Sequence, residues 1–252
     1  MKILSCHIIC LLTAFFSLHV KGQNNNFKKI EKDLLYHFNR INYWTINQML
    51  ISNTHIADSI ELENKIIEKK LKEYTNTNPS TIKYPFPELK KAGLSVITSN
   101  DGSFRIYSWD TESGGTEHLY NNIFQIKNNG RTISFSEDDD TRGYSKIFTL
   151  ALKGKTIYLA TYDGVYATLL FAKGIKLFTI EKNTFNDSAR LIKTGSGLQN
   201  ELSYEYHPSL DRTITFDSSS KTIYLPFVLK GGTVTKKIIK YRFTGNYFEK
   251  IK

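Results

Sequence analysis

The segment from Ser99 to Thr116, SNDGSFRIYSWDTESGGT, and the few residues after it hold the side chains best suited to chemistry. An Asp-Gly turn leads into a predicted strand, and a polar glycine-rich loop follows that strand. Alternate residues of a strand share a face. Arg105, Tyr107 and Trp109 are therefore expected on one face, and Phe104, Ile106 and Ser108 on the other. We take six residues as the candidate ligand-contact region: Arg105, Tyr107, Trp109, Asp110, Glu112 and His118.

His118 is the best candidate for a titrating residue, because imidazole changes charge near neutral pH. An exposed loop histidine is the simpler interpretation. The histidines after residue 22 form no H-x-x-x-H or H-x-H pattern, so the sequence predicts no metal site and no cofactor. The four consecutive acids Glu137–Asp140 cannot all face one ion, which favours a solvated turn over a calcium site.

Catalytic residues cannot be assigned from motifs. The chain contains no G-x-S-x-G element and no phosphate-cradling glycine loop. Paired carboxylates of a glycoside hydrolase can converge from separate strands, so that chemistry stays open. The possible members are Glu112, Glu117, Glu201 and Glu205, with no pair preferred.

Basic and aromatic residues alternate near the C-terminus, between Lys236 and Phe243. Such a ribbon can bind nucleic acid or an anionic polysaccharide through charge and stacking. On a strand, Lys236, Ile238, Lys240 and Arg242 would share one face. The simpler interpretation is therefore an outward basic face over a core face, where lysines also discourage aggregation.

The elements that position these residues divide the chain into three parts after residue 22. Residues 23–78 are predicted to be helical, because apolar residues recur every three or four positions, with a break near Ser52-Asn53-Thr54. Residues 79–93 form a Pro-rich linker, in which Pro85 and Pro87 are expected to exclude helix and keep the chain extended. Residues 94–252 are predicted to form an antiparallel β-domain.

The predicted strands of this β-domain are short and are joined by tight turns such as Asp163-Gly164. This pattern predicts a meander that is blade-like, as in a small or incomplete propeller, or alternatively a β-sandwich or open barrel. The pentapeptide Lys-Thr-Ile-Tyr-Leu occurs at 155–159 and again at 221–225. Other repeated short segments have different spacings, which indicates related hairpins rather than a regular repeat.

The pattern D-G-x-x-R-I-Y-S-W-D-T-x-x-G-G-T, at residues 101–116, resembles a segment of uncharacterised exported bacterial proteins. Those proteins have a helical N-terminal part and often close with an aromatic–Gly–aromatic end, as at residues 241–248 here. The resemblance implies an exported β-rich protein but does not imply any particular activity. Locally, the Trp109-Asp110 strand is also similar to a blade of Trp-Asp-type propellers, and residues 153–166 are similar to blades of secreted sensor propellers.

Residues 1–22, MKILSCHIICLLTAFFSLHVKG, are predicted to be a cleaved export signal, with a lysine near the start, an apolar run and Gly22 before a polar stretch. An uncleaved anchor helix is the alternative. Cys6 and Cys10, the two cysteines of the chain, lie in this segment, so the mature chain would have no disulfide and no Cys-ligated metal. Cleavage also removes two lysines from the 34 Lys and Arg residues, so 32 basic residues face 24 acidic ones and the net charge falls from +10 to +8.

Together these features predict an exported protein, periplasmic or secreted, that acts as a non-enzymatic binding or cell-envelope interaction module. Its expected partner is a protein or an anionic glycan of the envelope; nucleic acid is not expected, nor is an integral membrane span after signal cleavage. The alternative is a hydrolase that acts on polysaccharide with paired carboxylates near residues 109–118. A third hypothesis is that the helical segment docks on another protein.

Overall fold

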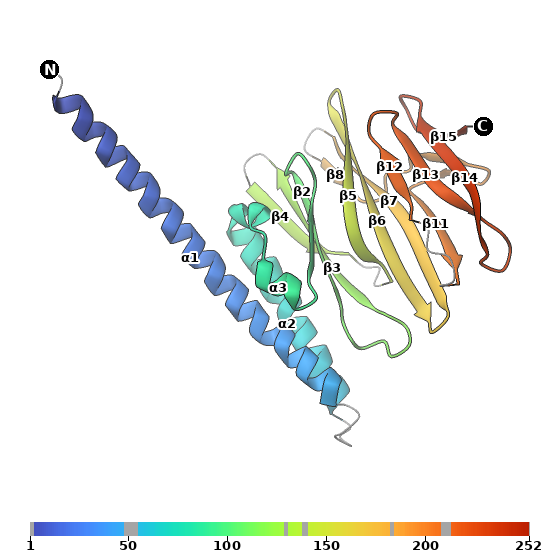
Figure 1. The fold of residues 1–252 in the computed structure, drawn as a ribbon, viewed down its shortest axis with the longest axis horizontal. Helices are drawn as coiled ribbons and strands as arrows, with labels where there is room; N and C mark the ends of the chain where they lie inside the picture. Colours follow the sequence, from blue (N-terminus) through green and yellow to red (C-terminus); the bar gives the residue numbers. More distant parts are fainter. Residues whose placement is uncertain are drawn as a thin grey trace.

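N-terminal helices precede three stacked β-sheets in the computed structural model (Figure 1). It describes residues 3–47, 55–128, 131–137, 141–181, 184–207 and 213–251, with side chains described from residue 25 onward. The predicted fold class, mainly β with N-terminal helices, is confirmed.

Two long helices form an antiparallel hairpin, α1 (Ile3–Asn47) and α2 (Ile56–Thr77). Their apolar stripes, which include Leu34 and Leu71, are fully buried, as the helical periodicity predicts. Helix α1 continues through the predicted cleavage point at Gly22. The predicted break at residues 52–54 lies outside the described residues.

The segment after α2 contains two short helical turns, η1 (Pro79–Lys83) and α3 (Pro87–Lys91). The prediction that Pro87 excludes helix is therefore wrong. Each proline stands at the first position of its helix, where the missing N–H removes no helical hydrogen bond. Between the two turns, Tyr84 and Pro85 lie outside helices, as expected.

The strands form three sheets, which we call the first, second and third sheets. The first has the order β1-β2-β3-β4: β1 (Ser95–Thr98), β2 (Phe104–Asp110), β3 (Tyr120–Asn128) and β4 (Arg131–Ser136). The second has the order β11-β7-β6-β5, with β8 also paired to β7: β5 (Gly143–Leu152), β6 (Lys155–Ala167), β7 (Leu170–Glu181), β8 (Thr184–Asn186) and β11 (Glu201–Tyr206). The third has the order β10-β9-β15-β14-β13-β12: β9 (Ile192–Thr194), β10 (Gly197–Gln199), β12 (Thr215–Asp217), β13 (Thr222–Val228), β14 (Val234–Phe243) and β15 (Phe248–Ile251). The pairing is antiparallel except between β15 and β9. The predicted turn at Asp163-Gly164 is wrong, because both residues lie inside β6 and pair with Lys173 and Ala172 of β7.

Three apolar clusters hold the layers together. The first joins the helices to the first sheet, the second joins the first sheet to the second, and the last joins the second sheet to the third. The helices cover the free face of the first sheet, whereas the outer face of the third sheet is left open at the other end of the stack (Figure 1). The sheets therefore stack face to face in a row, as in a sandwich or a run of blades.

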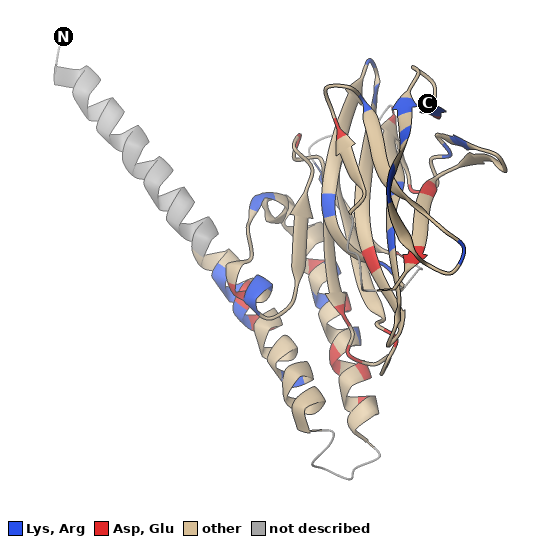
Figure 2. Cartoon of the chain, turned by 45° about the vertical axis from the view of Figure 1, so that its right-hand side comes forward, with Lys and Arg blue, Asp and Glu red and all other residues tan. Residues whose placement is uncertain are grey.

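The described helices do not include one with the length and the apolar run that a membrane span needs. Figure 2 shows acidic and basic residues mixed along the helices, which agrees with a solvated face. Lys72 and Glu68, for example, form an ion pair of 2.9 Å one turn apart on α2.

Candidate functional site

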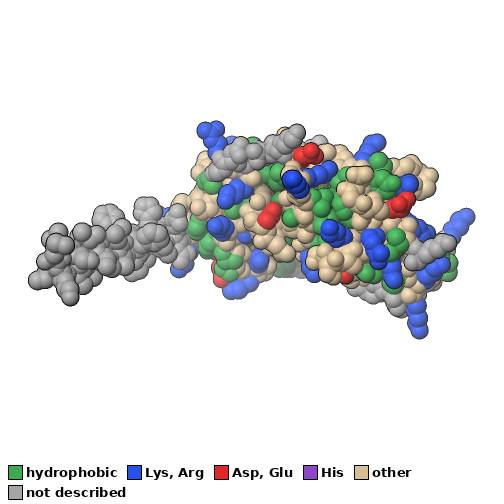
Figure 3. Space-filling view, turned by 90° about the horizontal axis from the view of Figure 1, so that it is seen from above, with side chains coloured by type: hydrophobic (Ala, Val, Ile, Leu, Met, Phe, Trp, Pro, Cys, Tyr) green, Lys and Arg blue, Asp and Glu red, His purple; other side chains and the backbone are tan. Residues whose placement is uncertain are grey.

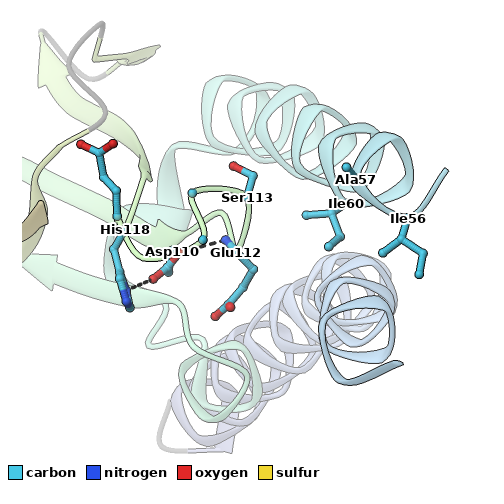
Figure 4. A pocket seen from close by; sticks show the side chains of 10 residues that line it. Ile56, Ala57, Ile60, Asp110, Glu112, Ser113 and His118 are labelled. Atoms are coloured by element: carbon cyan, nitrogen blue, oxygen red, sulfur yellow. Dashed lines mark hydrogen bonds and ion pairs between the residues drawn. The ribbon is translucent and has the colours of Figure 1, made fainter. Parts of the chain in front are cut away.

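A pocket of ≈ 370 Å³ lies where the loop after β2 meets the first turns of α2. Figure 4 shows its two walls: Ile56, Ala57 and Ile60 from the helix, and charged residues from the loop. This volume is large enough for a sugar-sized ligand. The loop wall consists of Asp110, Glu112, Ser113, Gly114, Gly115, Glu117 and His118.

Short-range contacts fix the shape of the loop. The backbone N–H of Glu112 donates to Asp110 Oδ1 at 2.8 Å, and Glu112 itself has φ 57, a left-handed conformation. Gly114 has no room for a side chain, because a Cβ there would lie 2.0 Å from the carbonyl oxygen of Glu117. Glycine at position 114 is thus required by close packing of the loop on itself.

His118 and Asp110 form the polar centre of the pocket. His118 Nδ1 lies 2.5 Å from Asp110 Oδ2, and the backbone N–H of His118 donates to the carbonyl of Val165 at 2.9 Å. Burial, and then the nearby Asp110 carboxylate, raise the pKa of Glu112, while His118 acts in the opposite direction. An oriented imidazole beside a carboxyl with a raised pKa offers hydrogen-bonding groups to a bound polar ligand.

The structure divides the six predicted residues into two groups. Asp110, Glu112 and His118 line the pocket, as described above. Arg105, Tyr107 and Trp109 share one face of β2, as predicted, but they are at most 5% exposed. They lie between the first sheet and the helical layer.

Each of these three buried residues makes polar contacts inside the protein. Arg105 donates to the carbonyl oxygens of Thr81 and Tyr84 at 2.7 and 2.6 Å. The hydroxyl of Tyr107 donates to Gln125 Oε1 at 2.9 Å, and burial raises its pKa. These contacts are those of a packed interface between two layers.

Asn64 is the partner that the sequence did not reveal. It lies in α2, is 5% exposed, and accepts a hydrogen bond of 2.9 Å from Trp109 Nε1. Its amide donates to the carbonyls of Ile60 and Thr111 at 2.9 and 2.8 Å. Its place on the apolar stripe of α2, between Ile60 and Ile67, is the signal in the sequence that could have predicted such a contact.

The C-terminal basic ribbon lies on the third sheet. Ile239, Tyr241 and Phe243 of β14 pack on the inner cluster, so Lys240 and Arg242 point outward and are exposed. The predicted basic face over a core face is therefore confirmed. The sequence did not predict the neighbours on this face, which come from other strands. They are Lys193 of β9, Tyr224 of β13 and Glu249 of β15.

The remaining acidic candidates are dispersed. Glu117 lines the pocket, whereas Glu201 pairs with Arg142 at 2.9 Å and Glu205 lies on β11 in the second sheet. Glu137 pairs with Lys176 at 2.5 Å, and residues 138–140 of the acidic run lie outside the described residues. Within the part of the chain that is described, no three His, Cys, Asp or Glu side chains are grouped to hold a metal ion.

Comparisons of the chain with protein-family models, with curated proteins and with solved structures give no match.

Proposed function

We propose that this protein is an exported, non-enzymatic module that binds an anionic glycan of the cell envelope. The observation that carries the proposal is the open outer face of the third sheet, where Lys193, Lys240 and Arg242 project from strands of one continuous sheet. We call these three residues the basic face. The proposed location, periplasmic or secreted, follows from the signal-like residues 1–22.

The cross-strand register spaces the charges of the basic face. Arg242 stands opposite Glu249, which stands opposite Lys193, so Arg242 and Lys193 are two strands apart. Neighbouring strands are about 4.8 Å apart, which separates the backbone positions of the two residues by about 10 Å, a distance that a disaccharide can span. Repeated carboxylate or sulfate groups along a glycan can then pair with successive cations.

Aromatic rings beside these cations favour a sugar polymer over a small ion. Lys240 Nζ lies 5.9 Å from the ring centre of Tyr224, and Lys193 Nζ lies 5.2 Å from that of Tyr247. An aromatic ring offers an apolar surface to the C–H face of a sugar while the neighbouring cation pairs with its acid group. Lys193 is also paired with Glu249 at 2.7 Å, so within the basic face Lys240 and Arg242 are more open to a ligand than Lys193 is.

The proposal can be tested by affinity co-electrophoresis of the full chain in gels that contain heparin, polygalacturonate or neutral dextran. We expect retardation by at least one polyanion and none by dextran, since the attraction is electrostatic. Lys240→Gln with Arg242→Gln should abolish most of it. The matched control, Lys69→Gln with Lys91→Gln on the exposed helical side, removes the same charge and should retain it. If both double variants lost the same amount of retardation, the retardation would depend on net charge alone, and the proposed binding face would be refuted.

A polysaccharide-directed hydrolase is the second candidate, and the pocket beside α2 favours it. Asp110, Glu112 and Glu117 line one hollow with His118, and the raised pKa of Glu112 suits a general acid. Release of reducing ends from a panel of polysaccharides would support this candidate if Glu112→Gln abolished the release. Turnover that is unchanged in Glu112→Gln would remove this pocket as the catalytic site.

A further inference from the structure

A groove of ≈ 740 Å³ opens between the second and third sheets, where β5 turns into β6. This turn lies at the top of Figure 1, whereas the pocket beside the start of α2 lies at the bottom. One wall is the β5–β6 hairpin around Gly154, and the other is formed by Lys221 and the β14–β15 turn at residues 243–246. Figure 3 looks down on this end of the molecule, where blue Lys and Arg side chains outnumber red acidic ones over the stacked sheets. The groove is distinct from the outer basic face.

The repeated pentapeptide Lys-Thr-Ile-Tyr-Leu explains why two lysines meet here. Its copies begin at Lys155, the first residue of β6, and at Lys221, directly before β13. The Ile and Leu residues of both copies lie in the single apolar cluster between the two sheets. Because alternate residues of a strand share a face, Lys155 continues the inward row of β6 one step beyond the core. Lys221 lies in the turn directly before β13, and both lysines line the groove, one from each sheet.

The charge of the groove is positive. Lys153, Lys155 and Lys221 line it together with one acid, Glu181, whose carboxylate lies 3.7 Å from Lys155 Nζ. An adjoining hollow of ≈ 470 Å³ shares Lys155 and Glu181 and adds Arg190. Four cationic residues and one acidic residue thus line the two hollows. Cations grouped in a concave site attract an anion more strongly than they do on a flat surface.

The backbone holds Lys221 in place without an ion pair. Lys221 has φ 51, and its carbonyl accepts a hydrogen bond of 2.9 Å from the N–H of Phe243. Asp217 stabilises the turn before it by accepting from the hydroxyls of Ser219 and Ser220, each at 2.7 Å. Within the described part of the chain, the Lys221 ammonium has no carboxylate partner, so its charge is available to a ligand.

The floor of the groove is apolar and its rim is polar. Ile157 and Phe243 lie at the floor, and Thr244 and Asn246 stand at the rim beside the lysines. A pocket with an apolar base and a few polar groups suits an organic ligand of sugar size that carries a charged substituent.

We propose that this inter-sheet groove is a binding site for a sugar-sized ligand whose phosphate, sulfate or carboxylate group is held between Lys155 and Lys221. Charge-assisted hydrogen bonds from both ammonium groups supply the affinity. The site is independent of the outer basic face, since the two sets share no lysine.

The test is calorimetric titration of the full chain with glucose 6-phosphate, glucose 6-sulfate, glucuronate and uncharged glucose. We expect saturable binding of at least one charged sugar and none of glucose, and the preferred sugar identifies the anionic group. In the double variant Lys155→Gln with Lys221→Asn, the affinity for the charged sugar should fall by about tenfold for each lysine removed. Asn is chosen at position 221 because it tolerates positive φ.

The matched control is Lys69→Gln with Lys91→Gln on the exposed helical side, which removes the same charge outside both the groove and the basic face and should leave the affinity unchanged. Thermal unfolding of each variant checks that the fold is intact, and backbone amide shifts of the native chain should respond around residues 153–155, 221 and 243–246. Absence of binding by all three charged sugars, equal binding of glucose, or native affinity in the Lys155/Lys221 variant would overturn the proposal.

Discussion

The indole Nε1 of Trp109 donates a hydrogen bond of 2.9 Å to Oδ1 of Asn64, and this contact joins the first sheet to helix α2. Both side chains are at most 5% exposed. The Asn64 amide continues the connection to the carbonyl of Thr111, at the start of the pocket loop. The helical layer and the pocket are therefore parts of one packed unit.

Asn64→Leu should destabilise the protein by about 2–4 kcal/mol, because the Trp109 N–H and the Thr111 carbonyl both lose their partner while buried. Urea unfolding monitored by tryptophan fluorescence measures the change. Lys69→Leu, at an exposed position of the same helix, should stay within about 0.5 kcal/mol. Equal effects of the two substitutions would show that the Asn64 contacts contribute nothing specific.

Deletion of residues 23–75 should abolish cooperative folding of the remaining β-domain. The deletion exposes Leu94, Tyr107 and Trp109, which are buried against the helices, and removes Asn64. Soluble expression and calorimetry of the truncated chain test this expectation. A truncated chain that melts cooperatively at the native temperature would instead favour a separable helical segment that docks on another protein.

Gly174→Ala should cost about 2 kcal/mol or more, because the new Cβ would lie 2.1 Å from Cζ of Tyr162, which is buried and hydrogen-bonded to Glu201. The control is Gly195→Ala, where a new Cβ would have nothing within 4 Å and φ is not positive. We expect that control to change the free energy of unfolding little or to raise it. Thermal unfolding of both variants gives the comparison; similar melting temperatures would contradict the packing described for the second sheet.

Asp217 should make the free energy of unfolding depend on pH in the acidic range. Hydrogen bonds from Ser220 and Ser219 lower the pKa of its carboxyl from 3.8 to about 2. The folded state therefore favours the ionised form, and this stabilisation is present above pH 3.8 and is lost as the pH falls toward 2. Asp217→Asn should be less stable than the native chain at pH 6, with the difference shrinking toward pH 2.

Urea midpoints at several pH values measure this difference. Ser196→Ala, in the exposed β9–β10 turn, serves as a control whose effect should not vary with pH. A difference for Asp217→Asn that is constant over this range would contradict the lowered pKa.

Periodicity predicted the local elements of the fold better than the roles of individual residues. The recurrence of apolar residues in the helices and the alternation along β2 and β14 each describe one local element, and the structure confirms them. Burial of Arg105 and Trp109 depends on which layer covers β2, and strand alternation cannot identify that layer because both faces of this strand are covered.

The inter-sheet groove also depends on contacts between layers that local sequence patterns do not identify. The two Lys-Thr-Ile-Tyr-Leu copies were visible in the sequence, but only the stacking of β6 over β13 brings Lys155 and Lys221 to one groove. Pro87 is the local exception: its ring suits the first turn of α3, and a rule that treats proline only as a helix breaker misses this position.

The central claim is that the outer face of the third sheet binds an anionic glycan, and the salt dependence of binding tests it most directly. Isothermal titration of the full chain with heparin between low and physiological ionic strength should give an affinity that falls steadily with salt. Lys240→Gln with Arg242→Gln should weaken the binding at low salt and flatten that dependence. Binding that is independent of salt, or identical in the native chain and this variant, would contradict the account.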